Sequence, residues 1–219
     1  MMAAVCGTMV WVGAALAQPF DTNFTFDVNA VVPDGTPLGL TLTTNLTLAA
    51  GSTISDLTVS LDITGGYNGD LYAFLSGPDG GFAILLNRVG VSNNASAFGY
   101  GDSGFNVTFS DAAAHSIQYY QDYTDPAGGV VLGTWQPEGV NIAPQSSPAT
   151  FLTTGQTAML SSFDGTDANG TWTLFLADLS AGGQSTVVSW SLDIVTVPEP
   201  QTWVLGALGL SLLAAKRLG

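Results

Sequence analysis

Residues 163–178 read FDGTDANGTWTLFLAD, and this stretch decides the fold. Its first half, residues 164–170, predicts a turn, because Gly accepts a positive φ and Asp and Asn side chains bond to nearby backbone. Its second half, residues 171–177, is β-branched, aromatic and aliphatic, and predicts a strand. Alternate residues of a strand share one face. The face expected to point into a core holds Trp172, Leu174 and Leu176.

A second alternating strand follows the Gly182-Gly183 turn. Two alternating strands on either side of a Gly-rich turn are typical of a hairpin. We therefore expect a closing hairpin with Trp172 and Trp190 in its core. One face of the second strand holds Val188, Trp190, Leu192 and Ile194, and the other holds Val187, Ser189, Ser191 and Asp193.

The chain before this hairpin repeats the same pattern of short alternating strands. Leucines recur at spacings of two over residues 38–48, and apolar residues alternate with polar ones over residues 57–63 and 105–109. Phe82, Ile84 and Leu86 share one face of a further strand. Residues 70–76 carry apolar side chains on both faces, as a central strand does. Gly, Asn and Asp turns separate these strands, and no stretch between the termini has a helical period. The pattern predicts an all-β sandwich.

Several blocks, in order, resemble the P domain, also called the P/Homo B domain. This domain follows the subtilisin-like catalytic domain in proprotein convertases. The C-terminal blocks are NGTWTL at residues 169–174, the carboxylate of Asp178, a Gly-rich turn and VSWSLDI at residues 188–194. The earlier blocks are SDLTVSLDI at residues 55–63, Gly69-Asp70-Leu71, LSGPDG at residues 75–80 and Leu85-Leu86. The resemblance spans residues 40–195.

This resemblance implies a jelly-roll β-sandwich of about eight strands, similar to galactose-binding domains, which we place at residues 18–195. It implies an association with proteolysis but not proteolysis by this chain. A serine hydrolase needs a nucleophile, a base and an orienting group. The chain has a single histidine, His115, and no GxSxG motif. We therefore expect no enzymatic activity.

The N-terminal residues 1–17 are apolar and end in Ala15-Leu16-Ala17, a small-x-small site before Gln18. This pattern predicts a secretory signal peptide that signal peptidase removes. The alternative is a buried N-terminal helix. The single cysteine, Cys6, lies in this segment, so the mature protein has no thiol for a disulfide or a metal site.

The C-terminal residues 197–219 resemble a PEP-CTERM sorting signal. The motif Pro198-Glu199-Pro200 is followed by an apolar run at residues 203–215 and by Lys216-Arg217. The resemblance implies a short transmembrane helix and cleavage at the motif by an exosortase. It places the protein in the inner membrane of a Gram-negative bacterium before processing, and at the cell surface or in the extracellular matrix afterwards. The alternative is an ordinary C-terminal anchor.

The chain is strongly acidic, with 17 Asp and Glu against 3 Lys and Arg and a net charge of −14. Such a surface repels nucleic acids and anionic membranes and suits divalent cations. Calcium takes several oxygen ligands, which Asp-rich turns at one end of a sandwich can supply. The alternative is that these residues only form turns. The candidate calcium ligands are Asp56, Asp70, Asp102, Asp111, Asp164, Asp167 and Asp178.

Residues 112–148 are the least regular part of the chain and are longer than the matching stretch of the convertases. Long loops on a rigid sandwich often carry binding residues. The alternative is a packed cover over a sheet edge. Four aromatic side chains in this stretch would favour sugar binding if they are exposed: Tyr119, Tyr120, Tyr123 and Trp135.

Two classes of function follow from the sequence. The first is an exported, non-catalytic surface or structural module, held in the bacterial envelope or its exopolysaccharide. The second is an accessory P domain associated with a subtilisin-like serine protease, or a carbohydrate-binding module. The sorting tail favours the first class, because the P-like domain is then the whole mature protein.

Overall fold

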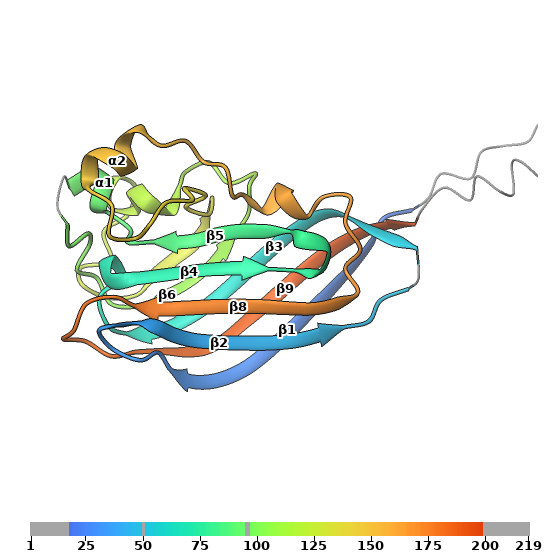
Figure 1. The fold of residues 1–219 in the computed structure, drawn as a ribbon, viewed down its shortest axis with the longest axis horizontal. Helices are drawn as coiled ribbons and strands as arrows, with labels where there is room; N and C mark the ends of the chain where they lie inside the picture. The colour runs from blue at the N-terminus through green and yellow to red at the C-terminus, as the bar shows by residue number, and fades with distance from the viewer. Residues whose placement is uncertain (1–17, 50, 95–96, 199–219) are drawn as a thin grey trace, which may run out of the picture.

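The computed structural model describes residues 18–49, 51–94 and 97–198, which form two sheets packed face to face (Figure 1). The five-stranded sheet has the order β1 (Phe20–Val31), β9 (Ser185–Pro198), β3 (Ser52–Gly65), β6 (Phe105–Phe109) and β7 (Val131–Trp135). The four-stranded sheet has the order β2 (Thr36–Leu46), β8 (Gly170–Asp178), β4 (Leu71–Ser76) and β5 (Phe82–Asn87). The chain changes sheet at every connection except β4–β5 and β6–β7, as in a jelly roll. The predicted all-β sandwich is confirmed, with β1 to β9 in place of about eight strands.

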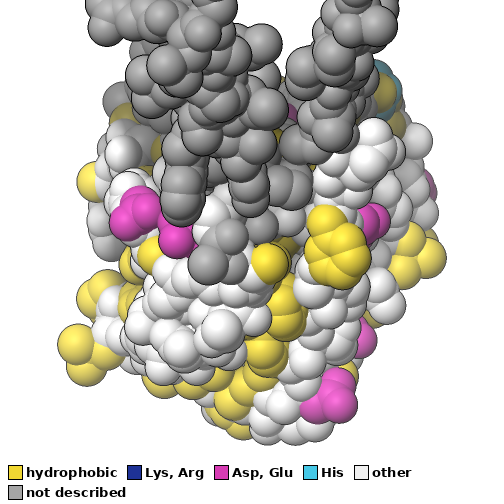
Figure 2. Space-filling view, turned by 90° about the vertical axis from the view of Figure 1, so that its right-hand side faces the viewer, with side chains coloured by type: hydrophobic (Ala, Val, Ile, Leu, Met, Phe, Trp, Pro, Cys, Tyr) yellow, Lys and Arg dark blue, Asp and Glu magenta, His cyan; other side chains and the backbone are white. Residues whose placement is uncertain are grey.

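Short helices occupy the connections between the strands. The α-helices α1 (Val91–Asn94) and α2 (Pro148–Thr153) lie together at one end of the sandwich (Figure 1). The 3-10 helices are η1 (Asn68–Asp70), η2 (Pro78–Gly80), η3 (Ile117–Asp122) and η4 (Leu160–Phe163). At the other end, Phe20 at the start of β1 pairs with Thr196 near the end of β9. Figure 2 faces this end and shows hydrophobic side chains together with scattered Asp and Glu side chains.

The predicted closing hairpin is wrong, because β8 and β9 lie in opposite sheets. β8 pairs with β2 and β4, and β9 pairs with β1 and β3. The Gly-rich turn therefore carries the chain from one sheet to the other. Alternation predicted which face of each strand is buried but contains no information about its partner. Both tryptophans still reach the core, with Trp172 0% and Trp190 3% exposed.

One residue of the predicted inner face of β9 is also wrong. Val187 is fully buried and Val188 is only half-buried, although the sequence alternation placed Val188 inside. The pairing of β3 with β9 shifts at this point, because Asp62 pairs with Ser189 and Ile63 pairs with Val187. A β-bulge adds one residue to a strand and moves the following side chains to the other face.

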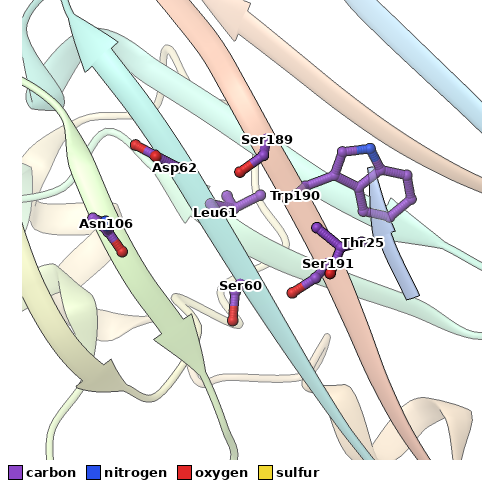
Figure 3. Close-up of a pocket in the computed structure, with 8 residues that line it drawn as sticks. All are labelled: Thr25, Ser60, Leu61, Asp62, Asn106, Ser189, Trp190 and Ser191. Carbon is purple, nitrogen blue, oxygen red and sulfur yellow. The ribbon is translucent and has the colours of Figure 1, made fainter. Parts of the chain in front are cut away.

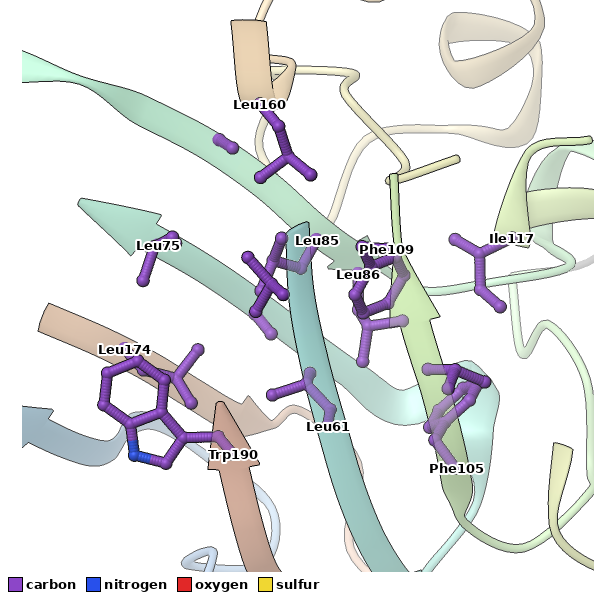
Figure 4. Close-up of a cluster of buried hydrophobic side chains, with 14 of the residues drawn as sticks. Leu61, Leu75, Leu85, Leu86, Phe105, Phe109, Ile117, Leu160, Leu174 and Trp190 are labelled. Carbon is purple, nitrogen blue, oxygen red and sulfur yellow. The ribbon is translucent and has the colours of Figure 1, made fainter. Parts of the chain in front are cut away.

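The core lies between the sheets and is filled by aliphatic and aromatic side chains from both (Figure 4). Trp172 is the largest fully buried side chain. Its ring stacks on Phe163 with the ring centroids 5.2 Å apart, and its indole nitrogen donates to the Ala168 carbonyl at 2.9 Å. A buried tryptophan needs such a partner for its N–H group. The segment that precedes β8 therefore supplies the stacking ring, from the end of η4, and the acceptor, from the turn, for Trp172.

The strand β4 is central, as predicted, because it lies between β8 and β5. Its outer aromatic residues explain its apolar second face. Phe74 stacks on Phe175 of β8 at 5.0 Å between centroids and also contacts Phe82 of β5 at 5.2 Å. These rings are half-buried and pack against one another rather than forming a flat exposed platform.

Candidate functional site on the outer face of the five-stranded sheet

The outer face of the five-stranded sheet is covered by small polar side chains. Residues that pair across neighbouring strands stand side by side on one face. One row across the sheet runs through Thr25, Ser191, Ser60 and Thr108. The next row runs through Asp27, Ser189, Asp62 and Asn106. We call these two rows the polar face.

The polar face is hollowed by a shallow pocket of about 180 Å³ (Figure 3). Hydroxyl, carboxylate and amide groups surround it, and the neighbouring residues Leu61 and Trp190 are buried in the core. The hydroxyls of Ser60 and Thr108 share a hydrogen bond of 2.9 Å. The short hydroxyl, amide and carboxylate side chains around the hollow present both hydrogen-bond donors and acceptors to solvent.

Acidic groups continue along this outer surface. The Asp193 carboxyl lies beside that of Asp21, and their hydrogen bond, burial and the charges of Asp21 and Asp56 raise the pKa of Asp193 to about 6. Arg88 is the only Lys or Arg in the described residues, and its Nε donates to the Gly69 carbonyl near the start of β4. The polar face thus suits neutral or cationic ligands and disfavours anionic ones.

The predicted calcium ligands do not form one cluster. Asp56 and Asp111 each lie near Asp164, because burial and then the charges of these two residues raise the pKa of Asp164. Asp70 and Asp178 form a separate pair where β4 begins and β8 ends. Within the described ranges, no group of three or more His, Cys, Asp or Glu side chains is arranged to hold a metal ion.

Two of the predicted ligands near the start of η4 and the turn before β8 bond to backbone or side-chain donors instead. Asp111 accepts from the amides of Leu160 and Ser161, at 3.1 and 2.8 Å, where η4 begins. Asp167 accepts from the backbone and side-chain nitrogens of Asn169, at 2.9 and 2.6 Å, within the turn before β8. These contacts agree with the alternative that Asp and Asn here form turns.

Asp102 belongs to a buried hydrogen-bond network. Its carboxylate accepts from the Tyr120 hydroxyl at 2.7 Å, the Gln121 amide at 2.6 Å and the Gly128 N–H at 2.9 Å. Burial and the bond to Asp102 raise the pKa of Tyr120, so its hydroxyl stays a donor. The Asn68 side chain donates to Tyr120 and bonds both backbone groups of Gly104. Asp102 therefore links the loops around it and has donors on both carboxylate oxygens.

The predicted aromatic residues divide between core and surface. Tyr120 is 0% exposed and Trp135 is 6% exposed, so neither can offer a ring face to a sugar. Tyr119 is half-buried, and Tyr123 is 55% exposed. His115 lies at the surface with its ring stacked on Tyr123, 3.5 Å between centroids. The four rings therefore form no common exposed surface.

The long segment at residues 112–148 covers a sheet edge. The amides of Glu138 and Gly139 donate to the carbonyls of Leu85 and Ile84 on the free edge of β5, at 3.1 and 2.9 Å. The same segment supplies β7, which pairs in parallel with β6. This arrangement agrees with the alternative that the segment is a packed cover over a sheet edge. It protects the unpaired backbone groups of the edge strand β5.

The polar face itself was missed in the sequence. Its signal was present, because Ser60, Asp62, Ser189 and Ser191 fall on the outward positions of two alternating strands. The sequence did not show that β9 pairs with both β1 and β3, and this pairing places these residues side by side.

The predicted signal peptide and the residues from Glu199 onward lie outside the described residues, as do the predicted C-terminal helix and most of the sorting motif. Pro198 is described only as the last residue of β9. Among the described residues, no helix combines the length and the apolar character that a membrane span requires.

No family model matches the chain, and no curated protein matches it either. Among solved structures, the chain is similar to a serine protease of Aeromonas sobria, with 18% identity, and to this protease in complex with its chaperone, with 17% identity. Both matches have a TM-score of 0.44 and cover 82% of this chain and 27% of the other. The chain thus spans about a quarter of the length of the proteins it matches. A similarity this distant assigns neither activity nor partner.

Proposed function

We propose that the chain is an exported, non-catalytic β-sandwich module that is held in the bacterial envelope or its exopolysaccharide matrix by binding a neutral, hydroxylated polymer. The observation that carries the proposal is the polar face. Its two rows of hydroxyl, amide and carboxylate groups lie in register and surround a hollow. Sugar hydroxyls both donate and accept hydrogen bonds, as do Ser and Thr hydroxyls.

The charge of the chain supports a neutral polymer over an anionic one. The net charge is −14, and the polar face includes Asp27 and Asp62. Binding a polyanion would bring like charges together without a basic side chain to offset them. Nucleic acids are disfavoured for the same reason.

The proposal of a non-catalytic role has two supports. The sequence blocks that resemble a P domain include none of the blocks of a subtilisin-like catalytic domain. The single histidine, His115, is an exposed residue stacked on Tyr123. The export and sorting steps of the proposal depend on the signal-peptide and PEP-CTERM patterns in the sequence alone.

Co-sedimentation of the whole purified chain with an insoluble neutral glucan, and with alginate as the anionic counterpart, tests the proposal. Ser191→Arg places a long cation in the hollow of the polar face. The matched control is Thr173→Arg, because Thr173 is also half-buried on the outer face of a central strand, but in the other sheet. We expect the unchanged chain and Thr173→Arg to sediment with the glucan, and Ser191→Arg to remain in solution.

Equal sedimentation of both variants would rule out the polar face as the binding surface. Sedimentation with alginate but not with the glucan would contradict the charge argument.

A further inference from the structure

A second pocket, of about 260 Å³, lies among the loops at the end of the sandwich that carries α1 and α2. Its walls come from α1, η3, α2 and the segment that covers the edge of β5. None of its lining residues belongs to the polar face. We call it the loop pocket.

Two buried polar side chains of the loop pocket have atoms without a partner. Glu138 and Gln118 are each 2% exposed. Neither Glu138 Oε2 nor Gln118 Nε2 has a hydrogen-bond partner among the described residues. Leaving a buried polar atom unpaired costs about 1–3 kcal/mol, so native proteins pair such atoms with protein, water or ligand. Both atoms belong to residues that line the same pocket.

Other hydrogen bonds hold the Gln118 side chain and the backbone of Glu138 in place. The Gly90 amide donates to Gln118 Oε1 at 2.9 Å, which leaves the Nε2 donor as the free end of the amide. The backbone of Glu138 donates to Leu85 of β5 at 3.1 Å, and its carbonyl accepts from the Gln156 amide at 3.0 Å. A site whose groups are already held in place loses little conformational freedom on binding.

The chemistry of the pocket favours a neutral ligand. Burial raises the pKa of Glu138 well above its usual value and so favours the neutral form of its carboxyl. The described residues that line the pocket include no Lys or Arg. Its walls combine the ring of Tyr119, whose hydroxyl bonds to Ser92 at 3.2 Å, with the apolar side chains of Phe151 and Val140.

We propose that the loop pocket binds a neutral, polyhydroxylated small molecule of the class of a single sugar ring or the end of a glycan. Glu138 and Gln118 bond to its hydroxyl groups, and Tyr119 and Phe151 pack on its C–H faces. A hydroxyl group suits this pair, because it accepts from Gln118 Nε2 and either donates to or accepts from the Glu138 carboxyl. This proposal does not depend on the function proposed for the polar face, since the two sites share no residue.

Isothermal titration of the whole chain with glucose, galactose, mannose, xylose and N-acetylglucosamine tests this proposal. We expect at least one of these sugars to bind. Glu138→Leu replaces the carboxyl with an apolar group of similar size, so it removes the unpaired oxygen at this position and should keep the fold. We expect it and Tyr119→Ala to weaken binding about tenfold or more.

Tyr123→Ala is the matched control, because Tyr123 lies in the same segment but does not line the pocket. It should leave the affinity unchanged, and so should Ser191→Arg on the polar face. Glu138→Leu that still melts cooperatively but binds sugar as before would overturn the assignment of the site. The proposed ligand class would be overturned if none of the sugars bound. It would also be overturned if the chain bound ethanolamine instead of a sugar.

Discussion

At the scale of single residues, the buried carboxyl of Asp178 affects both the stability of the fold and its dependence on pH. It ends β8, is 0% exposed, and its Oδ2 has no hydrogen-bond partner in the described part of the chain. Burial, together with the charges of Asp70 and Asp34, raises its pKa to about 6, although the Ser180 amide opposes the shift. Its charged form therefore destabilises the folded state.

The pH dependence of stability should show this effect. Because the folded-state pKa of Asp178 lies above the ordinary value of 3.8, the folded protein holds this proton more tightly than the unfolded chain. The destabilisation is present at neutral pH and disappears as the pH falls from about 6 to about 4.

We expect Asp178→Asn to stabilise the protein at pH 7 by on the order of 1–2 kcal/mol and to flatten the rise in melting temperature between neutral and mildly acidic pH. Thermal melts at a series of pH values measure both the stabilisation and the change in the pH profile. Asp27→Asn removes an exposed charge and serves as the control. Identical pH profiles for Asp178→Asn and the unchanged chain would show that the charge of Asp178 does not destabilise the folded protein.

Calcium binding stays a prediction, and the structure narrows where to test it. Asp70 and Asp178 lie together, and burial raises the pKa of both. A bound cation would relieve their repulsion, with remaining oxygen ligands drawn from backbone and water. We expect millimolar calcium to raise the melting temperature, magnesium to do so less, and Asp70→Asn to reduce the shift. Asp164→Asn, near Asp56 and Asp111, should leave the shift intact, and a melt unmoved by calcium or chelator would end the hypothesis.

At the scale of elements, β8 connects the turn that precedes it to the core. Trp172 is fully buried between Phe163 and the rest of the core. Trp172→Ala leaves a large cavity and frees the Ala168 carbonyl, so we expect it to lower the free energy of unfolding by about 3–5 kcal/mol. Urea denaturation measures the loss. Thr171→Ala, at an exposed position of the same strand, should change it by less than about 0.5 kcal/mol.

The strands were more predictable from the sequence than their pairing. Alternation correctly placed Trp172, Leu174 and Leu176 inside, because burial of one face imposes a period of two on the residues. It could not predict that β8 and β9 separate into different sheets, since partner choice depends on contacts between distant segments. The bulge at Val188 escaped notice for a related reason, because it is defined by the neighbouring strand.

The candidate sites were harder to predict. Single residues such as Ser60 and Ser191 are common on exposed strands, and only the alignment of such residues across four strands forms the polar face. Glu138 lies in a segment that the sequence showed to be irregular, but its burial depends on packing against β5. The acidic turns were visible in the sequence, and the structure shows that several of their carboxylates bond within the fold.

At the scale of the whole molecule, processing decides which residues the mature protein keeps. We expect signal peptidase to cleave after Ala17 and exosortase to cleave near Pro198-Glu199-Pro200. Intact-mass spectrometry of the exported protein should then find Gln18 at the N-terminus and a C-terminus near Val197. An exported species that still ends in Lys216-Arg217-Leu218-Gly219 would instead indicate a plain anchor.

The pairing of Phe20 with Thr196 also has a mechanical consequence. The strand β9 is bonded to β1 on one side and to β3 on the other, whereas β1 is an edge strand bonded only to β9. A pulling force applied at the C-terminal end of β9 acts on a strand that two ladders of hydrogen bonds hold. The same force applied at the N-terminal end of β1 acts on an edge strand that a single ladder holds. The sandwich therefore bears a load more strongly through its C-terminal strand than through its N-terminal one.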